Sequence, residues 1–262
     1  MPTAPALFIG HGSPMNAIED TPSARGWAEI ATRFEKPRAI VCVSAHWVTD
    51  GVRVTANAQP KTIHDFGRGF PQALFDVQYP APGDPTLAQN LAERLAAFGA
   101  RLDESWGLDH GAWSVLRRMY PDADIPVVQL SLDARRGPAE HLAIARALTP
   151  LREENVLILA AGNIVHNLRA FFRTRELEPW VASFDDFITQ AAAAGDENAI
   201  LNYAQRPEAA EAAPDWDHFF PIFYAIGARL PDERGFIFNR HHEPGISMTS
   251  FGFGLAPTDS KQ

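Results

Sequence analysis

Three histidines follow short apolar runs, at positions where buried strands are expected to end. His11 follows LFIG, His46 follows AIVCVS with one alanine between, and His166 comes four residues after VLILAAG. Apolar runs bounded by glycine favour buried strands, and open α/β sheets bind ligands at the carboxyl ends of their strands. Imidazoles gathered at such an edge could share a zinc, copper, iron or nickel ion. We therefore predict a histidine-rich metal site, although singly each histidine would more often be a hydrogen-bonded or surface residue.

The other histidines divide into a candidate ligand and expected surface residues. His218 lies in the aromatic segment WDHFF, where an imidazole without a polar partner would cost free energy. His141 falls on a predicted helix among alanine and glutamate, and we expect it to be exposed. We also expect His241 and His242 on the surface, in a polar loop.

Alternative chemistries find little support in the sequence. The histidines match no short zinc motif such as HExxH, and Ser13 is not part of a GxSxG nucleophile motif. The glycines around His11 do not form GxGxxG, which argues against a dinucleotide site. Cys42 lies within an apolar run and is expected to be a small buried residue.

The elements around these residues predict an α/β fold. Helical segments of about 10–15 residues separate the apolar strands, a pattern that favours a sheet covered on both faces. We predict a single catalytic domain over residues 1–262, with a central mixed, mostly parallel sheet covered by helices on both faces. Asp215–Leu230 is predicted as an apolar helix with Pro221 in its first turn or kinking it. Ile246–Gly254 is predicted as an edge strand, and Lys61–Pro82 as a long loop with one helical turn.

Composition limits the partners and the compartment. The net charge of −9 argues against binding nucleic acid, which needs a basic surface. No segment resembles a membrane span or a signal peptide. Cys42, the one cysteine, cannot form an internal disulfide, so we expect a cytoplasmic protein. We expect a monomer or small homo-oligomer.

A series of longer motifs runs through the chain in a fixed order. These motifs are HGSPMN at 11–16, SAHW at 44–47, TIHDFG at 62–67, FPQALFDVQYPAPG at 70–83, WGLDHGAW at 106–113, MYPDADIPVVQLS at 119–131 and GNIVHNLR at 162–169. Together they resemble the 4,5-DOPA extradiol dioxygenase-like family. Its relatives are the class III ring-cleavage dioxygenases, of which the protocatechuate 4,5-dioxygenase beta-subunit type is typical. The resemblance extends from about Leu7 to Gly254.

The resemblance implies a metal bound by histidines at one end of the sheet. His11, His46 and His218 resemble the ligands, and His166 resembles either a fourth ligand or the acid/base histidine above the metal. Fe(II) is the cofactor implied for dioxygenase activity, whereas Zn(II) is expected in the purified protein.

The resemblance also implies the residues around the substrate. His110 resembles a second catalytic histidine, and His64 is expected to line the pocket. We add Ser13 and Asn163 as substrate-contacting candidates. The family usually reads IHDFGGFP, whereas this chain reads IHDFGRGFP with Arg68 inserted in a loop expected to border the pocket, which leaves its substrate preference open.

The implied activity is extradiol cleavage of a DOPA-like or caffeate-like catechol by O2 at the non-haem metal. Zinc has no accessible redox chemistry, so a zinc-filled site could not activate oxygen in this way. A zinc-dependent hydrolase and a non-catalytic metal-containing binding protein are therefore the alternatives on the same fold.

Overall fold

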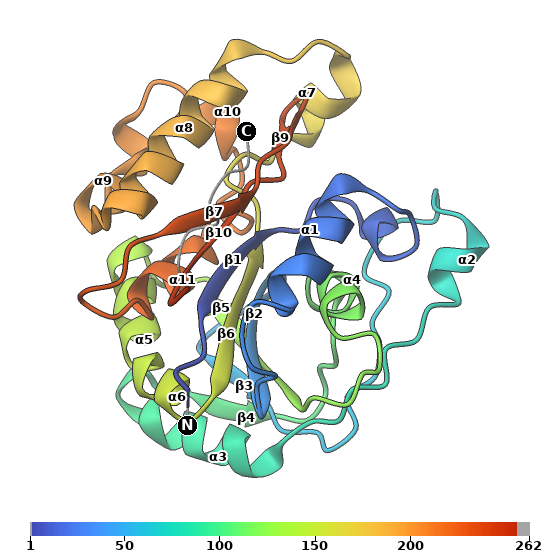
Figure 1. The fold of residues 1–262 in the computed structure, drawn as a ribbon, viewed down its shortest axis with the longest axis vertical. Coiled ribbons are helices and arrows are strands. Elements are labelled where there is room, and N and C mark those ends of the chain that lie inside the picture. The colour runs from blue at the N-terminus through green and yellow to red at the C-terminus, as the bar shows by residue number, and fades with distance from the viewer. Residues whose placement is uncertain (1, 256–262) are drawn as a thin grey trace.

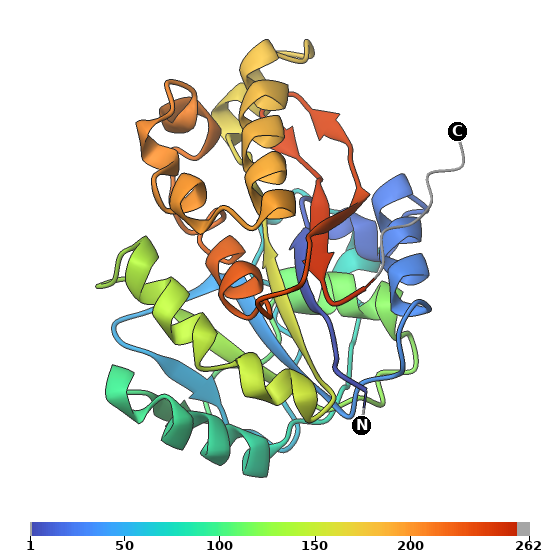
Figure 2. The same ribbon diagram turned by 60° about the vertical axis from the view of Figure 1, so that its left-hand side comes forward.

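The computed structural model describes residues 2–255, and within them eight strands form one mixed sheet (Figures 1 and 2). Its strands are β1 (Ala6–Gly10), β2 (Ala39–Thr49), β3 (Arg53–Thr55), β4 (Arg101–Asp103), β5 (Val127–Asp133), β6 (Val156–Gly162), β7 (Phe236–Asn239) and β10 (Ser250–Phe253), while β8 (His242–Glu243) and β9 (Ile246–Ser247) form a separate ribbon. The order across the sheet is β4-β3-β5-β2-β6-β1-β10-β7. Parallel pairing joins β5, β2, β6 and β1, so their carboxyl ends lie along one edge. The predicted mixed, mostly parallel sheet is confirmed.

Helices cover both faces of the sheet, as predicted (Figure 1). They are α1 (Pro22–Ala31), α2 (Gln72–Phe75), α3 (Pro85–Arg94), α4 (His110–Met119), α5 (Pro138–Arg146), α6 (Thr149–Glu153), α7 (Leu168–Arg173), α8 (Pro179–Ala194), α9 (Glu197–Leu201), α10 (Ala209–Ala212) and α11 (Ile222–Gly227). Alternate strand residues face opposite layers, so Phe8 packs in the core with α5, α8 and α11, and Ile9 in the core with α1 and α4. Within residues 2–255, none of the helices has the length and apolar character needed to cross a membrane.

The C-terminal segment is not the predicted edge strand. Ile246–Ser247 form β9, and Ser250–Phe253 form β10, which lies between β1 and β7 in antiparallel pairing. Strand β7, which the sequence did not predict, lies beyond β10 at this edge of the sheet. Because β10 has a neighbour on each side and lies between two cores, it is fully buried.

The predicted helix at Asp215–Leu230 is largely wrong. Helix α11 covers only Ile222–Gly227, and residues 214–221 form turns. Pro221 has no backbone N–H to continue a helix, and Oδ1 of Asp217 accepts a hydrogen bond from the backbone N–H of His218. These local features favour turns, which place His218 at the carboxyl edge of the sheet.

The expectation that His141 is exposed is also wrong, because α11 covers its face of α5. The side chain is fully buried, with Nε2 lying 3.2 Å from the carbonyl oxygen of Asp133 and Nδ1 lying 3.0 Å from the hydroxyl of Tyr224. A carbonyl can only accept, so Nε2 carries the hydrogen and Nδ1 accepts from the tyrosine. Burial lowers the pKa of His141 to about 4, and the neutral ring is the stable form.

We predict that His141→Gln makes the free energy of unfolding less dependent on pH between about pH 7 and about pH 5. An unfolded histidine has a pKa of about 6.5, so below that pH the unfolded chain binds a proton that the native protein excludes. Native stability therefore falls as pH falls toward 4, and glutamine removes this contribution while keeping a donor and an acceptor. The free energy of unfolding, measured with denaturant at about pH 7 and about pH 5, should fall less in the variant than in the wild type. An equal loss in both proteins would contradict the prediction, and His241→Gln, at an exposed histidine, is the matched control.

Candidate metal centre

Five histidines meet at the carboxyl end of the parallel strands, supplied by segments far apart in the chain. They are His11, His46, His110, His166 and His218. His11 directly follows β1, His110 begins α4, and His166 follows β6. The predicted gathering of strand-end histidines at one edge therefore occurs, and it includes both His110 and His218.

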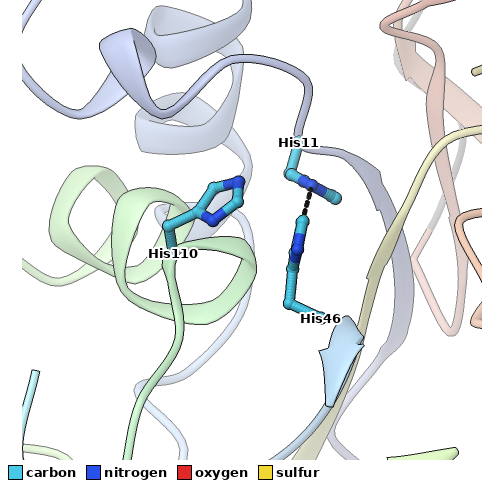
Figure 3. A group of neighbouring side chains, drawn as sticks. All are labelled: His11, His46 and His110. Atoms are coloured by element: carbon cyan, nitrogen blue, oxygen red, sulfur yellow. Dashed lines mark hydrogen bonds between the residues drawn. The ribbon is translucent and has the colours of Figure 1, made fainter. Parts of the chain in front are cut away.

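The side chains of His11, His46 and His110 lie closest to a common point (Figure 3). The Nε2 atoms of His11 and His46 are 3.0 Å apart. Among the residues that the structure describes, one nitrogen from each of the three rings lies within 4.8 Å of the others, an arrangement that could hold a metal ion.

His46 reaches this point because β2 does not end where the sequence predicted. The strand continues to Thr49, but its pairing with β5 shifts register between Val43 and Val48. Such bulges bend a strand and redirect its side chains, and they are common beside active sites. Here the irregular stretch contains His46.

His218 and His166 complete the cluster on its other side. The ring centroid of His218 lies 5.4 Å from that of His11 and 4.9 Å from that of His46, while His11 and His46 are 5.0 Å apart. These three rings thus form a nearly equal-sided triangle. His166 stacks on His218 in parallel, with 3.6 Å between centroids.

Two aspartates that the sequence analysis missed contact the outer nitrogens of these rings. Oδ2 of Asp65 lies 2.9 Å from Nδ1 of His110 and 3.3 Å from Nδ1 of His46. Oδ1 of Asp217 lies 3.0 Å from Nδ1 of His218. Metal-binding histidines usually donate their second ring N–H to a carboxylate or carbonyl in this way. For Asp217 the available signal was its adjacency to His218, whereas Asp65 follows His64 in sequence but contacts His46 and His110.

The rings of His11, His46, His166 and His218 are neutral, which is the form that binds metals. Burial, together with the neighbouring imidazoles, lowers the pKa of His46 to about 3 and that of His166 to about 4, and holds the pKa of His11 and His218 well below 6.5. Nδ1 of His11 is buried without a hydrogen-bond partner among residues 2–255. A set of neutral imidazole nitrogens without thiolates fits a non-haem transition metal ion.

Asn163 connects the segments that carry the histidines. Its Oδ1 accepts from the backbone N–H of Gly12 at 3.3 Å, and its Nδ2 donates to the carbonyl oxygen of Ser247 at 2.8 Å. Its backbone N–H donates to the carbonyl oxygen of His218 at 2.8 Å. The buried amide therefore ties the residues after β1, β9 and the turns before α11 to the end of β6.

Two other predicted substrate-contacting residues lie at the rim. Ser13 is exposed, and its Oγ accepts from the backbone N–H of Met15 at the start of a 3-10 turn. His64 donates from Nε2 to the carbonyl oxygen of Val77 and packs beside aromatic rings in the loop before α2. Arg68 is exposed in the same loop.

Comparisons with known proteins agree with this architecture. Residues 5–254 match the family model described as the catalytic LigB subunit of aromatic ring-opening dioxygenase. The chain is 46% identical over 230 residues to 4,5-DOPA dioxygenase extradiol of Escherichia coli strain K12, covering 86% of this chain and 84% of the relative. It is 37% identical over 256 residues to the Beta vulgaris protein of the same name, covering 94% and 95%. A crystal structure of an uncharacterized Escherichia coli K12 protein aligns with a TM-score of 0.82 at 40% identity, covering 95% of this chain and 99% of that chain.

Gly162→Ala is predicted to displace His218 and weaken metal binding. A Cβ at this position would lie 2.3 Å from the carbonyl oxygen of His218 and 3.0 Å from Cγ of Pro221, so the turns must shift. We expect a destabilisation of about 1–3 kcal/mol, and zinc affinity about tenfold weaker or more in a chelator competition. Gly137→Ala is the control, because its Cβ would meet nothing within 4 Å. Wild-type zinc affinity in the Gly162 variant would refute this role.

Proposed function

The chain belongs to the family of the catalytic LigB subunit of aromatic ring-opening dioxygenases, and we propose that it opens the ring of a DOPA-like or caffeate-like catechol. As an extradiol dioxygenase, it breaks the ring bond beside the diol, and both atoms of O2 enter the product. The observation that carries the proposal is the convergence of the neutral, buried imidazoles of His11, His46, His166 and His218 at this edge of the sheet.

We assign the metal to His11, His46 and His218. The near-equal separation of their ring centroids supports this set, and the aspartates at Nδ1 of His46 and His218 leave both Nε2 atoms available. One ring nitrogen of His110 also lies within 4.8 Å of those of His11 and His46, but we assign His110 to the substrate, which is the place that the family resemblance implies. Fe(II) is the proposed working ion, because zinc, which we expect in the purified protein, is redox-inactive. When bound, the ion would lower the pKa of the catechol hydroxyls and supply the redox chemistry with O2.

The remaining histidines are proposed to handle protons and substrate. His166 is the proposed acid/base, or else a fourth ligand, and His110 the second catalytic histidine, since an imidazole nitrogen can accept a proton from a catechol hydroxyl. His64 and Ser13 are proposed to line the substrate side at the rim. Asn163 is proposed to act on the substrate indirectly, by accepting the hydrogen bond that holds the backbone of Gly12 in place.

The proposal extends to the domain organisation, oligomeric state and cellular location of the protein. We propose one catalytic domain over residues 1–262, acting as a monomer or small homo-oligomer. The buried, unpaired Cys42 is consistent with the proposed cytoplasmic location, where thiols stay reduced.

Oxygen consumption tests the proposed activity directly. Metal-stripped protein reloaded anaerobically with Fe(II) should consume O2 in proportion to added DOPA and form a coloured ring-opened product. The zinc-loaded protein should consume none, because zinc cannot exchange electrons with O2. Absence of uptake with DOPA, caffeate and protocatechuate at full iron occupancy would refute the proposal. Zinc-dependent hydrolysis without oxygen demand would instead favour the hydrolase alternative.

Single histidine variants separate ligands from proton carriers. His11→Ala and His218→Gln should lose bound metal, whereas His110→Gln should keep metal and lose about 10²–10⁴-fold in turnover. Metal content by mass spectrometry and oxygen uptake are the two measurements, with His241→Gln as the exposed control. Retained metal without turnover in His166→Gln would assign the acid/base role, and metal loss would assign a fourth ligand. Full metal content in His218→Gln would refute our ligand set.

A further inference from the structure

Asp65 contacts two of the clustered histidines through one carboxylate oxygen. Its Oδ2 lies 2.9 Å from Nδ1 of His110 and 3.3 Å from Nδ1 of His46, and its Oδ1 accepts from the backbone N–H of His110 at 2.8 Å. An ionised carboxylate can only accept, so the hydrogen bond to His110 requires hydrogen on its Nδ1, and the contact with His46 favours hydrogen on that Nδ1 as well. The neutral ring of His46 then presents a lone pair at Nε2, which faces Nε2 of His11.

On the basis of the proposed function, we propose that Asp65 is a positioning residue. It sets both the tautomer and the orientation of His46 and His110. One carboxylate thereby links a metal ligand to the histidine beside the substrate. Asp65 would not contact the metal or the catechol itself.

The close packing of the two rings explains why a shared acceptor is needed. Their centroids are 3.9 Å apart, and Gly111 permits this approach, because a Cβ there would lie 2.4 Å from Oγ of Ser44 and 3.1 Å from Cδ2 of His46. Two neighbouring ring N–H groups that point toward each other repel electrostatically. A negatively charged oxygen between them, here Oδ2 of Asp65, attracts both and outweighs the repulsion.

Asp65 also fixes the loop on the substrate side of the cluster. The next residue, Phe66, places its ring 5.6 Å from that of His110. Beyond it, a Cβ on Gly67 or Gly69 would meet nothing within 4 Å, whereas the two hydrogen bonds of Asp65 join this loop to His110. Loss of the carboxylate should therefore raise the KM for DOPA as well as weaken metal binding.

Asp65→Asn tests the proposal with two measurements that do not need catalysis. An asparagine amide would turn an N–H₂ toward Nδ1, which must then accept, and the ring hydrogen would move to Nε2, where it blocks metal binding. We expect zinc affinity in a chelator competition to fall about 10- to 100-fold. Nitrogen-15 NMR of the imidazoles in metal-stripped protein should show hydrogen on Nδ1 of His46 and His110 in the wild type, and on Nε2 in the variant.

Two further variants make the outcome decisive. Asp65→Glu keeps the carboxylate and should recover zinc affinity at least in part, and Asp84→Asn should leave zinc affinity unchanged, since Asn and Asp cap helix α3 equally well. Wild-type zinc affinity and tautomers in Asp65→Asn would overturn the proposal. The proposal would also be overturned if Asp65→Glu bound zinc as weakly as Asp65→Asn. If Asp65→Asn does not fold, zinc binding by Asp65→Glu remains the test.

The same measurements distinguish this proposal from the proposed function. Weakened zinc binding in Asp65→Asn, with no oxygen uptake by the iron-loaded wild type, would reject the dioxygenase activity and support the positioning role. Oxygen uptake by the wild type, with unaltered zinc binding in Asp65→Asn, would support the dioxygenase activity and reject the positioning role.

Discussion

The structure depends on keeping several imidazoles neutral and close together at a buried edge of the sheet. Each ring loses hydration on burial, and a charge on one would repel the others, so protonation is strongly disfavoured. Imidazole N–H groups still need partners, and carboxylates at the periphery lie beside Nδ1 of His46, His110 and His218. The aspartates thus satisfy the outer nitrogens while the inner ones remain available for a metal.

The backbone is shaped to bring these rings together. The irregular stretch of β2 redirects His46, and the absence of a side chain at Gly162 lets the turns carrying His218 pack directly on the end of β6. Asn163 then ties three segments to one another. Short hydrogen-bonded connections of this kind hold the loops on the rigid sheet, which is how a site built from loops keeps a defined geometry.

The sequence predicted those features that depend on local pattern. Apolar runs ending in glycine predicted the strands that deliver His11 and His166, and the ordered motifs identified the family and the remaining candidate histidines. Features set by distant segments escaped prediction. His141 looked exposed because the later helix α11, which carries Tyr224, covers this face of α5, and the local sequence pattern does not show that contact. Likewise, the contact of Asp65 with two rings depends on how a long loop folds back onto the sheet.

The position of β10 has a consequence for biosynthesis. This strand pairs with β1, and Ser250 accepts a hydrogen bond at Oγ from the backbone N–H of Gly10, next to His11. Strand β1 therefore lacks this neighbour until Ser250, 240 residues after Gly10, has been translated. Such a non-local pairing forms late, because a long intervening chain must first be ordered. Because β10 holds the residue next to His11, we expect metal to be loaded only after this segment has been synthesised, and until then β1 lacks its antiparallel partner.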